Sequence, residues 1–188
     1  MDLKDIRTLY SYNRWANLRM FSVLGKLNEQ QFAATMQSSF PSIRESVFHI
    51  LAAEWIWLMR WTGMSPIATQ PVTGVSTETW KGLRAGGVAP PQQLATVAEL
   101  RAFCDSLEEE RRHFIAGLTE EALQAPLDHT DMSGKPHSQP LAELMQHVVN
   151  HGTYHRGQVT TLLRQAGAET IALDMVYFFR EKREKPDR

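Results

Sequence analysis

The sequence predicts an all-α protein folded as a four-helix bundle, with a long connection between the second and third helices and a short apolar C-terminal segment. Three observations support this fold: four stretches have apolar residues three or four positions apart, capping residues open them, and glycines close three of them. The 188 residues, 43% hydrophobic and 22% charged, are typical of one globular domain. We therefore expect a single domain over residues 1–180 and a charged tail over residues 181–188.

The first two predicted helices occupy the N-terminal third of the chain. The first runs from Asp2 or Leu3 to Leu27, where apolar residues recur at helical spacing. The second begins at Ser42, whose hydroxyl can cap the helix while an acidic residue three positions later completes a capping box, and it ends at Gly63. The second helix is apolar nearly all round, so we expect it to be buried on more than one side.

The third and fourth predicted helices follow the same rules. Thr96 and an acidic residue three positions later repeat the capping-box pattern, and Gly117 lies near the end of that helix. The fourth helix is predicted to open near Ser138 with Pro140 in its first turn, where the missing amide hydrogen costs nothing. It is predicted to close at Gly167.

Two connections are longer than the turns of a bundle require. Residues 64–95 are rich in proline, and a connection of this length is often functional, for example as a lid, although residues 77–83 also fit a short helix. Residues 125–140 fit either a small hairpin or an ordered loop. Beyond Gly167, an apolar segment is expected to pack back on the bundle. Its apolar residues are Ile171, Leu173, Met175, Val176, Tyr177 and Phe179.

Composition argues against several classes of function. The 20 basic and 21 acidic side chains leave a net charge of −1, which provides no global positive field for nucleic acid, so we expect no such partner. The single cysteine, Cys104, excludes an internal disulfide and fits a reducing compartment, so we expect a cytoplasmic protein in which Cys104 is a small buried hydrophobe. No apolar run is long enough for a signal peptide or a membrane span, and we expect no membrane partner.

Histidines carry the strongest chemical signal in the chain. Three of the seven, His147, His151 and His155, lie in one stretch of the fourth predicted helix, where residues four apart are rotated by about 40°. The apolar stripe of that helix passes through positions 151 and 155, whereas position 147 lies further round, so His151 and His155 are predicted to point inward. The histidines at 113, 129 and 137 lie on a charged helix face or in loops and are expected to face solvent.

A third inward ligand is available in the second predicted helix. His49 lies among apolar residues there, and burial favours the neutral imidazole that a metal requires. We therefore predict a divalent metal site formed by His49, His151 and His155, for which zinc or nickel comes before iron or manganese. The alternative is that each buried imidazole only donates a hydrogen bond to a carbonyl, because an H-x-x-x-H spacing alone is a weak signal.

Glu54 is the one carboxylate at the centre of the apolar stripe of the second predicted helix, and it needs a partner there. Its carboxylate can accept a hydrogen bond from an imidazole that binds the metal and so orient that ring, or it can act as a general base. Glu54 is therefore a weak catalytic candidate. It can also simply pair with an arginine, and we favour that interpretation because structural ion pairs are the more common reason for a buried charge.

Three segments of the chain resemble the DinB-like (YfiT-like) metal-binding four-helix-bundle family, and the resemblance extends over nearly the whole chain. Residues 12–17, YNRWAN, resemble the family's Y-x-x-W-A-N segment, and residues 42–55 resemble its second helix. The most specific match is residues 147–158, HVVNHGTYHRGQ.

This resemblance implies both a metal site and a range of activities. It implies that His49, His151 and His155 hold a divalent metal, in agreement with the helical wheel. It also implies a homodimer and, for some members, thiol-dependent S-transferase or isomerase activity with a low-molecular-weight thiol.

Two functional hypotheses follow. The first is a metal-dependent enzyme whose ion activates a thiol or water against a small-molecule substrate, as an S-transferase, isomerase or hydrolase. The second is a non-catalytic stress-response module that uses the bundle for ligand binding and dimerisation. Metal-dependent turnover distinguishes the two.

Overall fold

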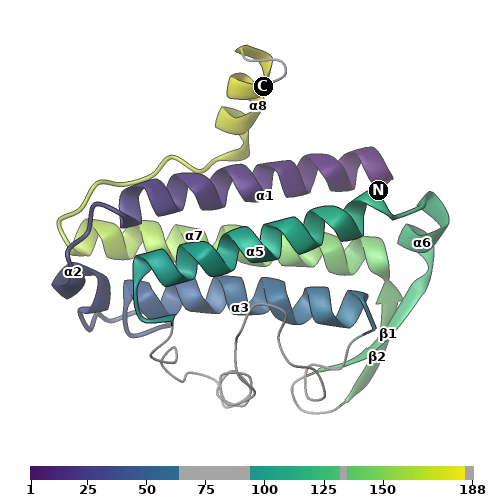
Figure 1. Ribbon diagram of the computed structural model, residues 1–188, viewed down its shortest axis with the longest axis horizontal. Coiled ribbons are helices and arrows are strands. Elements are labelled where there is room, and N and C mark those ends of the chain that lie inside the picture. Colours follow the sequence, from purple (N-terminus) through teal and green to yellow (C-terminus); the bar gives the residue numbers. More distant parts are fainter. Residues whose placement is uncertain (64–93, 132–134, 185–188) are drawn as a thin grey trace.

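Four long helices form the body of the protein, as the sequence predicts (Figure 1). The computed structural model describes residues 1–63, 94–131 and 135–184. The principal contacts join α1 to α7, α7 to α3, α3 to α5 and α5 to α1, so each helix has two long neighbours. The long helices are α1 (Leu3–Leu24), α3 (Ile43–Trp61), α5 (Val97–Ala116) and α7 (Leu141–Gln165).

Shorter elements lie at the ends of the bundle, except for α8, which packs on the side of α1 (Figure 1). Most of the predicted connection over residues 64–95, including the short helix considered over 77–83, lies outside the described residues. Two five-residue helices, α2 and α6, were not predicted. The shorter elements are α2 (Glu29–Ala33), α6 (Glu120–Gln124), β1 (Pro126–Thr130), β2 (Pro136–Pro140) and α8 (Met175–Glu184).

The capping residues place the helix starts accurately. Thr96 forms the complete predicted box, because its hydroxyl accepts from the N–H of Glu99 and its own N–H donates to the Glu99 carboxylate. Ser42 also caps α3, accepting from the N–H of Glu45 at 3.2 Å, but here the Glu45 carboxylate accepts from the Ser42 hydroxyl instead of from its backbone. Both helices begin one residue after the predicted cap.

Two predicted helix boundaries were wrong. α1 ends at Leu24, three residues before Leu27, and its C-cap Gly25 donates its N–H to the carbonyl of Phe21. α7 begins at Leu141 instead of near Ser138, because residues 136–140 pair with β1 in an antiparallel hairpin. The hairpin is one of the two alternatives that the sequence left open for residues 125–140.

The C-terminal segment packs back on the bundle, but only part of the expected apolar set takes part. Ile171, Leu173 and Met175 are partly buried against the core, whereas Val176, Tyr177 and Phe179 are 39–48% exposed. Phe178 of α8 is buried, and its ring lies 5.9 Å from the rings of both Tyr12 and Trp15. Glu181 accepts a hydrogen bond from the Trp15 indole at 2.9 Å and pairs with Arg19 at 2.8 Å. α8 therefore continues to Glu184, into the stretch expected as a charged tail.

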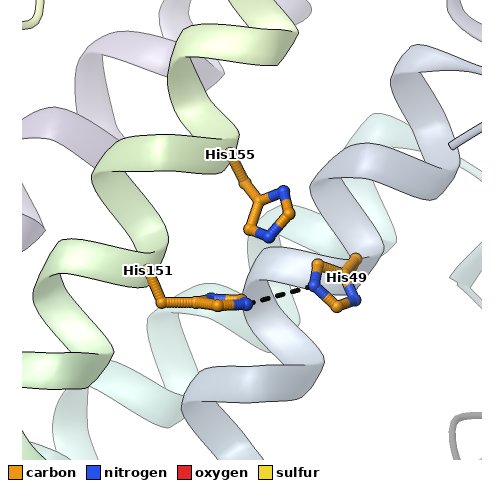
Figure 2. A group of neighbouring side chains, drawn as sticks. All are labelled: His49, His151 and His155. Atoms are coloured by element: carbon orange, nitrogen blue, oxygen red, sulfur yellow. Dashed lines mark hydrogen bonds between the residues drawn. The ribbon is translucent and has the colours of Figure 1, made fainter. Parts of the chain in front are cut away.

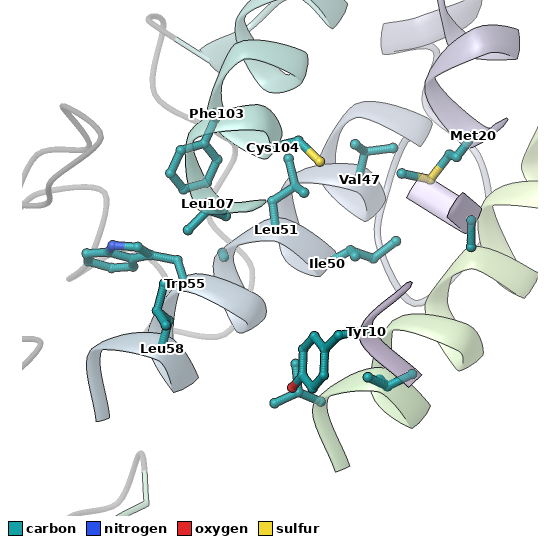
Figure 3. Packing of buried hydrophobic residues seen from close by; sticks show 14 of the residues in the cluster. Tyr10, Met20, Val47, Ile50, Leu51, Trp55, Leu58, Phe103, Cys104 and Leu107 are labelled. Carbon is teal, nitrogen blue, oxygen red and sulfur yellow. The ribbon is translucent and has the colours of Figure 1, made fainter. Parts of the chain in front are cut away.

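Apolar side chains of the four long helices meet in one continuous core (Figure 3). α3 contributes on more than one side, as its apolar sequence predicts, with Val47 and Ile50 fully buried and Trp55 only 1% exposed. None of the helices in the described ranges is both long and apolar enough to cross a bilayer.

Gly152 lets α7 approach α1 closely. A Cβ at this position would lie 3.0 Å from an Arg156 guanidinium nitrogen and 3.3 Å from the Asn13 side-chain oxygen, two atoms that are hydrogen-bonded to each other. Gly157 of the same helix faces open space, because a Cβ at that position would have no neighbouring atom within 4 Å.

The two glycines give a matched pair of substitutions. Gly152→Ala is expected to destabilise the fold by about 1–3 kcal/mol, because the methyl group overpacks a tight contact. Gly157→Ala is expected to stabilise it by up to about 1 kcal/mol, because alanine is the better helix former. Chemical denaturation measures both values, and an equal effect of the two substitutions would contradict the close approach at Gly152.

Candidate metal centre

Three histidines converge where α3 packs against α7 (Figure 2). His49 comes from α3, while His151 and His155 lie one turn apart on α7. One nitrogen from each ring belongs to a set whose members all lie within 4.8 Å of one another. The structure therefore brings together the three imidazoles that the sequence selected.

The separation of the His49 and His151 ring nitrogens suits tetrahedral coordination. The Nε2 atoms of His49 and His151 are 3.2 Å apart, a distance at which one ring donates a hydrogen bond to the other. Two nitrogens bound to zinc at about 2.0–2.1 Å with a tetrahedral angle between them are about 3.3 Å apart. An ion can therefore replace the shared proton between these two rings with little movement of either.

Burial keeps these rings neutral. It lowers the pKa of His49 to about 3, with further lowering by His155 and His151, and it is also the main cause that lowers the pKa of His151 to about 4. Burial lowers the pKa of His155 as well, against the opposing effect of the hydrogen bond that His155 donates to the Gln158 side-chain oxygen. At neutral pH the three rings are therefore uncharged, and each can offer the lone pair of one nitrogen to a cation.

The exposure of the three histidines on α7 increases from His155 through His151 to His147, as their positions on the helical wheel predict. His155 is 8% exposed, His151 is half-buried and His147 is exposed. The His147 ring lies 5.9 Å from the His151 ring but does not belong to the converging set. His49 is half-buried, less enclosed than its apolar neighbours in the sequence suggested.

Gln158 fixes the orientation of the His155 ring through a hydrogen bond to Nδ1, a role that the sequence analysis did not identify. Its side-chain oxygen lies 2.8 Å from His155 Nδ1, and its amide nitrogen donates to Ser39 Oγ at 3.0 Å. Because an amide oxygen accepts, Nδ1 carries the proton in this contact and Nε2 is left as the lone-pair nitrogen. The spacing of three residues between His155 and Gln158 on one helix face was the available signal.

The three histidines that were expected to face solvent, His113, His129 and His137, do not belong to the converging set. His113 is exposed on α5. His129 and His137 are half-buried instead of solvent-facing, because they lie opposite each other in the hairpin with ring centres 5.7 Å apart. Trp57 covers this side, with its ring 5.1 Å from His129 and 5.6 Å from His147.

Glu54 pairs with an arginine, which is the interpretation that we favoured. It is 2% exposed, and its Oε2 accepts from Arg111 of α5 at 2.6 Å. Burial alone would raise the pKa of Glu54, but Arg111 and the amide of Asn13 outweigh it and hold that pKa below its ordinary value. Glu54 is therefore an ionised structural carboxylate and does not belong to the converging set of ligand atoms.

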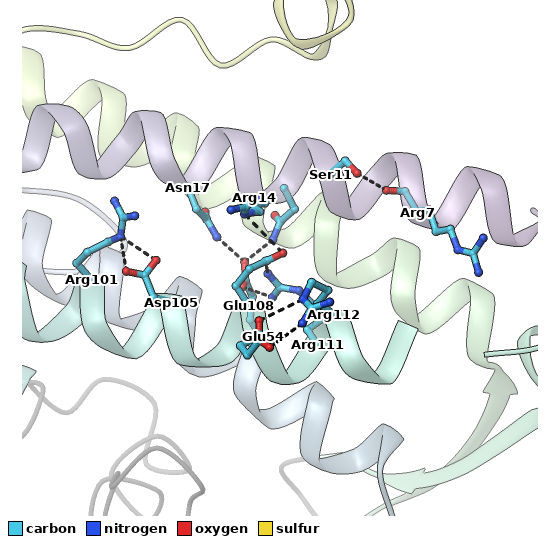
Figure 4. A network of polar contacts seen from close by, with 12 residues as sticks. Arg7, Ser11, Arg14, Asn17, Glu54, Arg101, Asp105, Glu108, Arg111 and Arg112 are labelled. Atoms are coloured by element: carbon cyan, nitrogen blue, oxygen red, sulfur yellow. Dashed lines mark hydrogen bonds and ion pairs between the residues drawn. The ribbon is translucent and has the colours of Figure 1, made fainter. Parts of the chain in front are cut away.

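A buried polar network extends this ion pair to all four long helices, and Figure 4 shows its part around Glu54, Arg111 and Asn17. The second carboxylate oxygen of Glu54 accepts from Asn13 at 2.8 Å and from Asn17 at 3.2 Å, both on α1. The oxygens of the same two amides accept from one nitrogen of Arg156 on α7, at 2.8 and 2.9 Å. Each of these residues is at most 3% exposed, so the network is enclosed by the core.

Cys104 is a buried hydrophobe, as predicted. It is 6% exposed, and burial raises the pKa of its thiol to about 12. At neutral pH the sulfur is a protonated thiol and therefore a poor nucleophile and a poor metal ligand.

Comparisons with known proteins agree with this fold. The model of the DinB family matches residues 1–186. Protein DinB of Bacillus subtilis (strain 168) is 30% identical over 183 residues, which cover 94% of this chain and 95% of that protein. The crystal structure of a DinB-like protein from Bacillus cereus ATCC 10987 aligns with a TM-score of 0.59 at 15% identity, over 91% of this chain and 97% of that one.

Replacing Glu54 tests whether the network holds the bundle together. Glu54→Gln keeps the shape of the side chain but leaves the buried Arg111 with only the half-buried Glu108 as a charge partner, so we expect a loss of about 3–5 kcal/mol in the free energy of unfolding. Glu109→Gln is the matched control, because Glu109 pairs with Arg112 at the surface, where a pair contributes about 0–1 kcal/mol. Urea denaturation that gave equal losses would show that the buried pair is dispensable.

Proposed function

The chain belongs to the DinB family, and on that premise we propose that it is a metal-dependent enzyme with one divalent ion bound by His49, His151 and His155. Three protein ligands leave a fourth position of a tetrahedral ion open, which is the arrangement of catalytic rather than structural zinc sites. The observation that carries the proposal is the approach of three neutral ring nitrogens to within 4.8 Å of one another.

The donor set fits a borderline metal. Three imidazoles without a carboxylate or thiolate suit zinc or nickel first, and iron or manganese next. Such an ion lowers the pKa of a bound thiol or water towards neutrality, which supplies a nucleophile. His155, oriented by Gln158, and the facing pair of His49 and His151 would hold the ion.

The nucleophile is proposed to come from outside the chain. The only cysteine, Cys104, is buried with its thiol pKa raised to about 12, so it cannot supply a thiolate. A low-molecular-weight thiol or a water molecule is therefore the proposed partner of the ion, with a small-molecule electrophile as substrate. The corresponding reactions are S-transfer, isomerisation or hydrolysis.

Glu54 is not proposed as the general base. Both of its carboxylate oxygens accept hydrogen bonds, from Arg111, Asn13 and Asn17. A base has to exchange a proton with a reacting group within hydrogen-bond distance, and a carboxylate held in this way has no free oxygen to offer.

Assembly and location are proposed on separate grounds. Three large apolar side chains of α8, Val176, Tyr177 and Phe179, are between 39% and 48% exposed, which supports a homodimer that covers them. The free Cys104 supports a cytoplasmic location, because a reducing compartment keeps such a thiol reduced.

Metal content is the first test. Protein purified without a nickel column is expected to contain about one divalent ion per chain, and His151→Ala is expected to lose most of it because two imidazoles cannot enclose the ion. His113→Ala is the control, since His113 is exposed on α5. Elemental analysis after dialysis gives the answer, and equal metal content in wild type and His151→Ala would refute the site.

Gln158→Ala tests the support behind His155. Without the amide oxygen the ring loses the contact that fixes its tautomer, so the affinity for zinc or cobalt is expected to fall by about 10–100-fold. Gln146→Ala, at an exposed position on the same helix, is the control. Competition with a chelating dye measures both affinities, and an unchanged affinity in Gln158→Ala would exclude a positioning role.

Turnover distinguishes an enzyme from a non-catalytic stress-response module. Metal-loaded protein is screened with low-molecular-weight thiols and small electrophiles, and we expect consumption of the thiol that stops with His49→Ala and with chelator. Thermal shifts by ligands without any metal-dependent turnover would favour the module instead.

A further inference from the structure

A cavity of about 580 Å³ lies on the seam between α1 and α5, and α8 contributes Phe178 to it. The converging histidines occupy the seam between α3 and α7, which is the opposite seam of the four-helix ring. The cavity is therefore separate from the candidate metal centre. Its volume falls within the range of about 300–1,000 Å³ that is usual for small-molecule sites.

Apolar and aromatic side chains form the interior of this cavity. Tyr10, Ile115 and Phe178 are buried, and Trp15 and Leu18 are half-buried beside them. The polar atoms of the aromatic residues are already engaged, because the Tyr10 hydroxyl donates to the carbonyl of Met145 and the Trp15 indole donates to Glu181. The interior thus offers apolar surface to a ligand.

Three arginines surround this apolar interior. Arg7 and Arg14 lie two turns apart on α1, and Arg112 contributes to the same lining from α5 (Figure 4). Helical spacing explains the arrangement, since residues seven apart return to the same face. The lining carries three positive charges against one negative charge, that of Glu108, in a chain whose net charge is −1.

These guanidiniums are available to a ligand. Glu108 bonds the buried Arg111 and reaches Arg14 only at 4.0 Å. Arg112 pairs with Glu109, but both side chains are about 60% exposed, and a pair of this kind is readily exchanged. For Arg7, no carboxylate in the described ranges lies within ion-pair distance.

We infer that this cavity binds a small organic acid, with its carboxylate held by Arg14 and Arg112 and its apolar body against Trp15 and Phe178. Arg7, which points away from these two arginines in Figure 4, adds positive charge to the rim. The arginine fork matches the two oxygens of a carboxylate, and the aromatic interior takes a flat or branched apolar body. An uncharged ligand of the same shape leaves the arginines unused, and a fully polar anion leaves the aromatic interior exposed to water.

The test uses 2-naphthoate as the probe, with 2-naphthamide as its uncharged counterpart, and calorimetry on the full chain after dialysis against EDTA. We expect saturable binding of naphthoate, at least about tenfold weaker binding of the amide, and a similar loss of naphthoate affinity in the double variant Arg14→Gln/Arg112→Gln. Arg101→Gln/Arg164→Gln removes the same charge outside this cavity and is expected to bind as wild type does.

Two further measurements keep the outcome decisive. Ser11→Trp, at an exposed lining position between the two arginines of α1, is expected to block binding while leaving every arginine in place. His151→Ala is expected to bind naphthoate normally, which separates this cavity from the candidate metal centre. Equal affinity for acid and amide, equal affinity in the two double variants, or no saturable binding up to about 1 mM would overturn the inference.

Discussion

The ion pair between Glu54 and Arg111 is the constraint on which the rest of the structure depends. Two charges removed from water cost several kcal/mol each unless they meet each other and have their other hydrogen bonds satisfied. Here Asn13 and Asn17 satisfy the carboxylate from α1, and Arg156 of α7 bonds the same two amides. The network therefore favours one arrangement of four helices, because a slip of any one of them would break hydrogen bonds of buried polar groups.

The same constraint orients the candidate metal centre. Arg156 directly follows His155, and consecutive residues on a helix are rotated by about 100°. Anchoring Arg156 against α1 therefore turns His155, and His151 one turn before it, towards α3 and His49. Gly152 permits this by leaving room for the Arg156 guanidinium between the two helices. The contacts that anchor Arg156 in the polar network therefore also bring the three imidazoles together.

Local signals in the sequence predicted the helices and the three histidines, whereas contacts between helices could not be predicted. The caps at Ser42 and Thr96 and the rotation of four-residue steps on α7 depend only on neighbours in the chain. The start of α7 was misplaced because pairing in the hairpin, a tertiary contact, competes with helix formation around Pro140. The partner of Glu54 was expected to be an arginine, but its identity depends on which helices become neighbours, and the role of Arg156 does as well. Gln158 lies three residues after His155 on the same helix, so its role had a local signal that was overlooked.

The most direct test of the account is X-ray absorption spectroscopy of the cobalt-substituted protein, because it counts the imidazoles around the ion. The account predicts one cobalt per chain with about three imidazole nitrogens at about 2.0–2.1 Å and one further light ligand in the open position. A shell made of oxygen atoms only, or one with fewer than two imidazoles, would contradict it.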